Sequence, residues 1–116
     1  MPIAFTLNNE EKAVPITEAD VIRIYDENVK NSTDYANPAN EVQSGKRSVT
    51  VRFILEKGAK VIVAPPETFC EISYSLALEQ EVKFIQVKKK ESYDQILGKE
   101  FVYQNELPER DILPSL

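Results

Sequence analysis

The sequence predicts an α/β domain of three layers, in which helices cover both faces of a mixed five-stranded sheet. The first reason is the order of patterns, because three β-rich runs come first and helical patterns then alternate with strands. The second is the run Val61, Ile62 and Val63, whose lack of alternation is typical of a strand buried on both faces. The length of 116 residues, with 42% hydrophobic and 28% charged residues, fits one globular domain.

The N-terminal part of the sheet is expected to come from residues 3–7, 21–25 and 29–35. Residues 3–7 alternate between larger apolar and smaller side chains, and residues 21–25 are rich in β-branched types. Residues 26–28, Asp-Glu-Asn, have the chemistry of a turn and predict a hairpin between the second and third strands. The third strand is polar, which suits an edge of the sheet.

The first helix is expected to begin at Ser48, after a loop of residues 36–46 that shows no periodicity. Gly58 is placed to end this helix as a left-handed C-cap. Residues 60–64 then form the central strand of the predicted sheet.

The second helix is expected to start within residues 65–68, because prolines suit a first turn and Thr68 and Glu71 have the spacing of a capping box. The predicted apolar stripe of this second helix consists of Phe69, Ile72, Leu76 and Ala77. A last strand is expected after it, at residues 82–87.

A third, short helix is predicted where Ser92 and Gln95 match another capping box, and Gly98 is placed to end it. We therefore divide the chain into a domain of residues 1–101 and a C-terminal tail of residues 102–116. The tail is too apolar for a simple linker, so we expect it to pack on the domain or on a partner.

The charge and cysteine content restrict the partners and the compartment. A net charge of -5 and a pI near 4.8 argue against nucleic-acid binding, which needs Lys and Arg to neutralise phosphates. One cysteine leaves no internal disulfide, and neither a signal-peptide pattern nor an apolar run of roughly 18–20 residues is present. We expect a cytoplasmic protein that does not span a membrane.

Loop positions predict where a pocket lies. If four of the strands run parallel, the loops at residues 8–20, 37–47 and 64–67 meet at the carboxyl ends of the strands. In open α/β sheets ligands bind at that edge where the order of connections reverses, here between the first and fourth strands. We therefore expect a binding pocket at this edge.

The loop before the first helix carries the strongest chemical signal, a combination of backbone amides, two cations and a helix N-terminus that favours an anion. Residues 64–67 are a poorer anion site, because their prolines have no amide donors and Glu67 adds negative charge. The alternative interpretation of the first pattern is an ordinary solvated loop with a serine helix cap, because motif matches this short recur by chance. The residues concerned are Ser44, Gly45, Lys46, Arg47 and Ser48.

Cys70 is a second candidate, because a cysteine in the first turn of a helix can have a lowered thiol pKa. A small buried apolar side chain is the alternative interpretation. With no histidine and one cysteine, the chain offers no Ser-His-Asp or Cys-His catalytic set and no four-coordinate zinc site of its own. We expect no enzyme, although covalent catalysis by a single Cys or Lys stays open, and we interpret Lys88, Lys89 and Lys90 as a solvated run.

Several segments, taken in order, carry a resemblance to a known family. They are residues 2–5, 14–19, 37–39, 47–58, 60–63, 66–76, 82–87 and 92–97. Over residues 1–101 the chain resembles the dinitrogenase iron-molybdenum cofactor biosynthesis family, nitrogenase accessory domains with a ribonuclease-H-like sheet. The resemblance implies that fold, and it implies an iron-sulfur or iron-molybdenum type cluster as the cofactor.

Two departures from the family pattern bear on that cluster. Where the family loop offers a histidine this chain has Ile16 and Thr17, and residues 44–46 stand in place of a cysteine-containing segment. We therefore expect a non-enzymatic accessory or carrier-like binding module whose cluster ligation is degenerate. Its expected ligand or anion site consists of Thr17, Ser44, Gly45, Lys46, Arg47, Ser48 and Thr68, with Cys70 as a weaker metal candidate.

The sequence allows two interpretations of what this protein binds. An accessory protein is one expectation, and the alternative function is a structural or protein-interaction domain without a small-molecule ligand. In that alternative the apolar tail or a sheet edge forms a homodimer.

Overall fold

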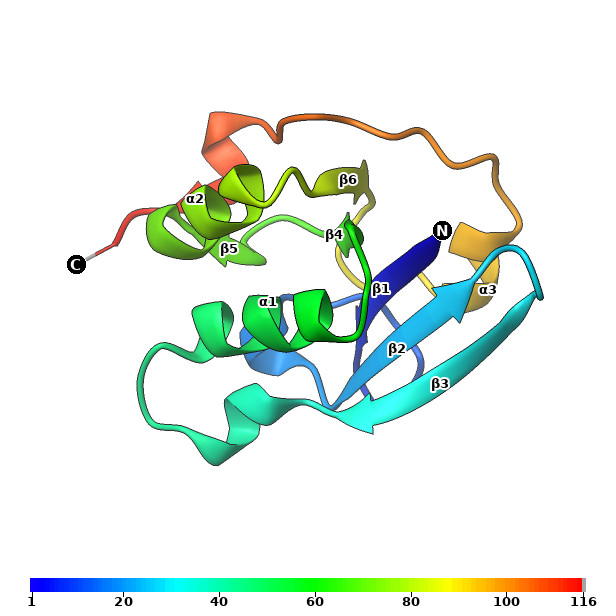
Figure 1. Cartoon of the computed structure of the whole chain (residues 1–116), viewed down its shortest axis with the longest axis horizontal. Helices are drawn as coiled ribbons and strands as arrows, with labels where there is room; N and C mark the ends of the chain where they lie inside the picture. The colour runs from blue at the N-terminus through cyan, green and yellow to red at the C-terminus, as the bar shows by residue number, and fades with distance from the viewer. Residues whose placement is uncertain (116) are drawn as a thin grey trace.

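A computed structural model describes residues 1–115 and shows an α/β chain built on a mixed five-stranded sheet, which confirms the predicted class at that level (Figure 1). The strand order is β3-β2-β1-β4-β6. The strands are β1 (Pro2–Leu7), β2 (Val21–Asp26), β3 (Asn31–Ala36), β4 (Val61–Ala64) and β6 (Lys83–Gln86).

Strand direction places four loops at one edge of the sheet. β2 runs antiparallel to both β1 and β3, whereas β4 pairs in parallel with β1 and with β6. The carboxyl ends of β1, β3, β4 and β6 therefore share one edge, which we call the rim. The connection order reverses between β1 and β4, as the sequence predicted.

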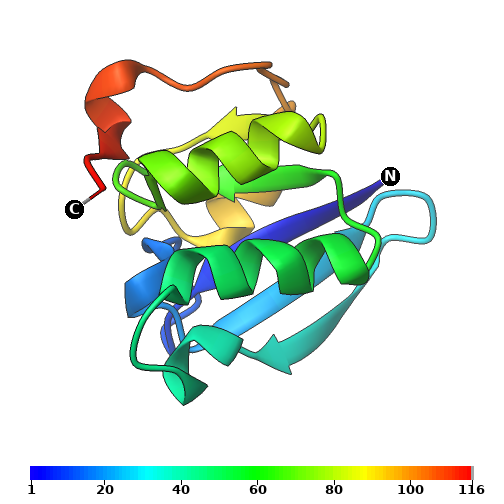
Figure 2. The same cartoon turned by 60° about the vertical axis from the view of Figure 1, so that its left-hand side comes forward.

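Helices lie on both faces of the sheet. α1 (Lys46–Glu56) and α2 (Glu71–Glu79) pack side by side on one face, and α3 (Tyr93–Leu97) packs on the other (Figure 2). Along β4, Ile62 belongs to the cluster under α1 and α2, whereas Val61 and Val63 belong to the cluster under α3. This strand is buried on both faces, which explains why its sequence is apolar without alternation.

The first hairpin follows local chemistry. The Asp26 carboxylate accepts a hydrogen bond from the Asn28 amide at 2.9 Å, and Lys30 adopts the left-handed conformation with φ 55°. The chain then returns as β3, which lies at the end of the strand order. The predicted turn and the predicted polar edge strand are both confirmed.

Both predicted starts of the long helices were wrong. α1 begins at Lys46 rather than Ser48, and its N-cap is Gly45, whose φ of 66° is left-handed. No side chain caps this helix, so Ser48 is not a cap. Gly58 has φ 84° directly after the helix, which confirms it as the left-handed terminator.

The start of α2 differs more. The helix begins at Glu71, because residues 65–68 form a turn that leads into a short strand, β5 (Phe69–Cys70). Thr68 and Glu71 therefore form no capping box. Phe69 is buried in the core from β5, and Ile72, predicted to be in the apolar stripe, is 61% exposed. Ala77 is buried as predicted.

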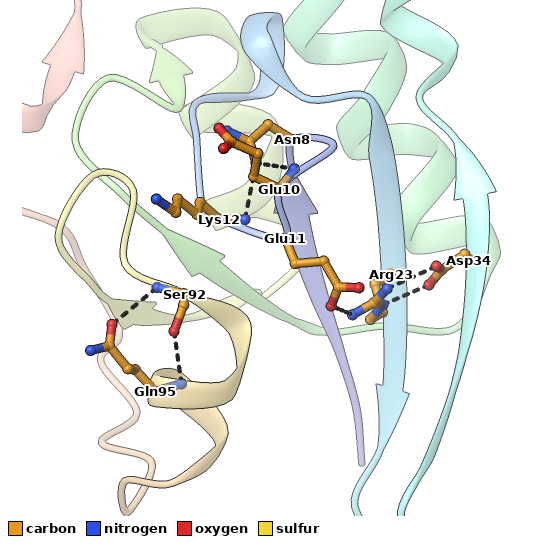
Figure 3. A network of polar contacts seen from close by, with 8 residues as sticks. All are labelled: Asn8, Glu10, Glu11, Lys12, Arg23, Asp34, Ser92 and Gln95. Carbon is orange, nitrogen blue, oxygen red and sulfur yellow. Dashed lines mark hydrogen bonds and ion pairs between the residues drawn. The ribbon is translucent and has the colours of Figure 1, made fainter.

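The third helix matches its prediction. The Ser92 hydroxyl accepts from the Gln95 amide at 3.1 Å, and the Gln95 side chain accepts from the Ser92 amide at 3.3 Å (Figure 3). Gly98 is the C-cap of α3. This is a capping box of the predicted residues at the predicted place.

A polar network holds the loop after β1 to the hairpin (Figure 3). Arg23 donates to both carboxylate oxygens of Asp34, at 2.7 and 2.9 Å, and to Glu11 at 2.7 Å. Its guanidinium also lies 4.4 Å from the centre of the Tyr93 ring. Residues from the loop, β2, β3 and α3 therefore meet at one side chain.

The C-terminal tail crosses from the end of α3 to the start of α2 (Figure 1). Gln104 pairs with Phe84 at the outer edge of β6, with 2.8 Å bonds in both directions. Leu107 is 9% exposed. A strand β7 (Ile112–Leu113) then pairs in parallel with β5. No helix within residues 1–115 is long and apolar enough to cross a bilayer.

Short 3-10 helices complete the loops. They are η1 (Ile16–Glu18), η2 (Pro38–Glu41) and η3 (Glu109–Asp111).

Candidate functional site

Asn37 joins the loops of the rim to α1. This buried residue follows β3, and its amide nitrogen donates to the carbonyls of Ile16 at 2.8 Å and Ala19 at 2.9 Å. Its side-chain oxygen accepts from the Ala39 amide at 3.0 Å and from the Thr50 hydroxyl at 2.8 Å. All hydrogen-bonding capacity of the amide is thus used inside the protein, so Asn37 positions the site rather than contacting a ligand.

A groove of about 370 Å³ lies where α1 begins, and we call it the rim groove. Residues 45–48 form one wall, Cys70 and Ile72 form a second, and Pro114 and Ser115 of the tail form a third. The structure therefore brings together two parts of the predicted site, the start of α1 and the residues after the β4 loop. Both lie at the same edge of the sheet.

The α1 wall of the rim groove is suited to negative charge. The first turn of α1 contains no acidic residue, and no side chain occupies its amides. These amides carry the positive end of the helix dipole. Ion pairs among residues 1–115 involve other cations and leave out Lys46 and Arg47.

Two buried polar side-chain atoms have no hydrogen-bond partner among residues 1–115. They are Arg47 Nε, from a side chain that lines the groove, and Thr68 Oγ1, from the residue two positions before Cys70. Thr68 is 1% exposed. Buried polar groups in proteins nearly always have a hydrogen-bond partner, so we expect a water, an ion or a ligand group to bind each of these atoms.

The other predicted residues divide between the groove and its surroundings. Lys46 lines the groove, but its ammonium donates to the Ala39 carbonyl at 3.2 Å and so also fixes α1 to η2. Ser48 lines the groove as well. Ser44 is exposed just before it, and Thr17 lies in η1 outside the lining.

Cys70 is the N-cap of α2 and is half-buried at the groove, outside the two core clusters. Burial is the largest single influence and raises the pKa of the thiol, but the hydrogen bonds from Ser73, the Ser115 side chain and the Ile72 amide together outweigh it. The net effect is a lowered pKa. The sulfur lies 3.4 Å from the Ser73 hydroxyl oxygen. The thiol is therefore a polar group of the groove, and not the buried apolar side chain of the alternative interpretation.

The tail contributes a wall that sequence reasoning missed. The Ser115 hydroxyl accepts from the Ile72 amide at 3.2 Å, and the Ser115 amide donates to the Glu71 carboxylate at 2.9 Å. These partners are separated by 43 and 44 positions in the chain. No local pattern announces such a contact, because it depends on the tail having docked.

The loop at residues 64–67, predicted to be a poor anion site, does not line the rim groove. The Glu67 amide donates to the Asp111 carbonyl at 2.9 Å, so it is used by the tail. This agrees with the expectation that the loop is a poor anion site. Lys89, in the basic run after β6, pairs with Glu18 at 3.2 Å.

Comparison with known proteins gives a fold-level likeness. No family model matches the chain, and no curated protein sequence matches it significantly. Among solved structures, the apo form of the orange protein from Desulfovibrio gigas superimposes with a TM-score of 0.68 at 14% identity. The match covers 84% of this chain and 83% of that one. At this identity the likeness shows a shared fold.

Proposed function

We propose that this chain is a non-enzymatic accessory or carrier-like module that binds an anionic group in the rim groove. The observation that carries the proposal is Arg47, a cation lining the groove whose Nε is buried without a partner among residues 1–115. A buried guanidinium nitrogen that lacks an acceptor is costly, and an anion supplies the missing acceptor. The uncapped first turn of α1 adds amide donors beside it.

The fold likeness supports the same class of function. The related solved structure is described as an apo form, which implies that the orange protein also exists with a bound group. We further interpret the strand order, with helices on both faces, as a three-layer ribonuclease-H-like arrangement. This interpretation agrees with the fold of the cofactor-carrying family that the sequence resembles.

The donors in the groove fit an anion better than a cluster held by protein ligands. Iron-sulfur clusters are usually held by several thiolates, and this chain has Cys70 alone and no histidine. A metal-sulfur group with net negative charge would instead be held by Arg47, Lys46 and the amides of α1 through charge-assisted hydrogen bonds. We therefore propose electrostatic rather than covalent retention of such a group.

The proposal is tested by titrating the protein with inorganic phosphate and, separately, by anaerobic reconstitution with iron and sulfide. Saturable phosphate binding is expected, with amide shifts at residues 45–48 in NMR spectra. Arg47→Ala should weaken it roughly tenfold or more, the loss of one charge-assisted hydrogen bond. Arg52→Ala is the matched control, because Arg52 is exposed on the same helix and does not line the groove.

Equal binding by wild type and Arg47→Ala, or no saturable binding of either probe, would leave the rival function in place. That rival is a structural or protein-interaction domain that forms a homodimer. The tail already uses Leu107 and β7 within its own chain, so the polar edge strand β3 is the better dimer contact. Sedimentation at micromolar concentration distinguishes the two functions.

A further inference from the structure

A second and larger groove, of about 560 Å³, lies between α2 and the tail, and we call it the helix–tail groove. α2 contributes Glu71, Tyr74, Ser75 and Leu78, which are spaced so that they form one stripe of the helix. The tail forms the opposite wall with residues between 106 and 114. Pro114 lines both this groove and the rim groove.

Apolar side chains form part of the lining of the helix–tail groove. Leu107 and Ile112 of the tail line it, and Leu78 is 38% exposed there. The Tyr74 hydroxyl accepts from the Leu107 amide at 2.8 Å, which holds the tail at a fixed distance from the helix. The two walls are therefore joined, and the hollow between them is part of the folded structure.

The ionisable side chains that line the helix–tail groove are acidic. Glu71, Glu106 and Glu109 line it, and no lysine or arginine does so among residues 1–115. Glu106 and Glu109 are exposed and take part in none of the ion pairs of that part of the chain.

Any partner that covers Leu78 and Leu107 must also remove water from these carboxylates. Loss of hydration is costly unless the partner supplies opposite charge. An apolar surface alone, or an anionic one such as an acidic membrane, therefore gains little here. A segment with apolar anchors flanked by cations gains both contacts.

From this charge and shape we infer that the helix–tail groove is a docking site for a short basic, amphipathic segment of another protein. The apolar side chains of that segment fill the hollow between α2 and the tail, and its Lys or Arg side chains pair with Glu106 and Glu109. This inference goes beyond the proposed anion site and does not depend on it.

The test uses a short fluorescein-labelled peptide of leucine and lysine in a helical amphipathic pattern, followed by fluorescence anisotropy. A peptide with glutamate in place of lysine is the probe control. Saturable binding of the basic peptide is expected, and Glu106→Lys with Glu109→Lys should weaken it about tenfold or more. Glu10→Lys with Glu56→Lys changes the net charge equally at exposed residues outside the groove and should have little effect.

A third variant, Leu78→Ser, should weaken binding of the same peptide, because Leu78 is a large apolar side chain that is exposed in the groove. Hydrogen exchange should show protection in α2 and in residues 106–114. The inference is overturned if both charge-reversal pairs weaken binding equally, since that shows a general attraction to an acidic protein. It is also overturned if sedimentation shows self-association that the Glu106 and Glu109 variant abolishes, because the occupant is then a second copy.

Failure of this inference is separable from failure of the proposed function. The variant with Glu106→Lys and Glu109→Lys leaves the residues of the α1 wall unchanged. Phosphate titration of that variant should therefore match wild type whether or not the peptide binds.

Discussion

At the scale of single residues, the molecule departs from expectation most clearly at Cys70. A thiol beside Phe69 in sequence suggests a buried apolar side chain, yet the two residues point to opposite sides of a two-residue strand. Phe69 enters the core, whereas Cys70 faces the rim groove. Its environment is set by hydroxyl and amide donors.

These donors predict an unusual reactivity of Cys70. The lowered thiol pKa means that the thiolate forms at a lower pH than in the unfolded chain, so alkylation by iodoacetamide should reach its full rate at a lower pH. Ser73→Ala should raise the pKa of the Cys70 thiol, because it removes the Ser73 hydroxyl, the hydrogen-bonding group that opposes burial most strongly. The measurement is the alkylation rate as a function of pH.

Ser75→Ala serves as the control, since Ser75 is exposed on the same helix and is not among the groups that shift the thiol. An alkylation midpoint that is the same in folded and urea-unfolded protein would contradict the assignment of Cys70 to a polar groove.

At the scale of elements, the first hairpin and the loop after β1 depend on Arg23. The guanidinium makes two parallel hydrogen bonds to Asp34 and a third to Glu11, and this geometry is the strong form of an arginine–carboxylate pair. The hydrogen bond from Arg23 lowers the pKa of Asp34, although burial partly opposes it. The edge strand β3 is thereby tied to its neighbour β2 and to the loop after β1.

Asp34→Asn should destabilise the protein at neutral pH by about 0.5–1 kcal/mol, near the upper end for surface pairs because the bonds are bidentate. The estimate stays small because the Asp34 side chain is 47% exposed. The pKa of Asp34 is lower in the folded than in the unfolded chain, so its stabilisation is complete above the unfolded pKa of about 3.9. It is lost as the pH falls through the folded value.

Urea unfolding of wild type and Asp34→Asn should therefore differ at neutral pH and converge in acid. Glu10→Gln is a suitable comparison, because Glu10 is exposed and forms no ion pair among residues 1–115. A difference that persists unchanged in acid would show that the carboxylate charge is not the cause.

At the scale of the whole molecule, the C-terminal tail packs across several elements of the fold. It covers the outer edge of β6, buries Leu107 and forms a two-stranded sheet with β5. It also forms walls of both grooves. The division of the chain after residue 101 remains a prediction, and the extent of these contacts makes it testable.

Deletion of the residues after Tyr103 should lower the free energy of unfolding by about 3 kcal/mol or more, because it exposes the apolar surface that Leu107 and Ile112 cover. Leu107→Ala should account for about 2 kcal/mol of this loss. Both values come from urea unfolding followed by circular dichroism. An unchanged unfolding midpoint after deletion would show that residues 1–103 are stable without the rest of the tail.

Sequence patterns predicted the features that depend on near neighbours. The Asp26 turn, the Ser92 capping box and the Gly58 terminator each rest on contacts within a few positions, and each was confirmed. The burial of β4 on both faces could also be predicted from the sequence, because its side chains are all apolar and do not alternate with polar ones. The position of the rim followed from the order of these elements.

The starts of α1 and α2 could not be predicted in the same way. Serine and threonine are good caps in general, but Ser48 lies inside a helix and Thr68 lies in a bend before β5. β5 exists because β7, more than forty positions later, pairs with it. Local propensity for a cap was thus overridden by a distant strand.

By itself, the sequence determined the fold class, the hairpin and the edge of the sheet where a cationic loop would lie, since these follow from periodicity and chain order. Only the tertiary structure decided that Arg47 Nε is buried without a partner and that Ser115 meets the start of α2. It also decided that three carboxylates and several apolar side chains line one groove between α2 and the tail. The physical reason is that burial and long-range hydrogen bonds depend on how segments far apart in the chain pack together.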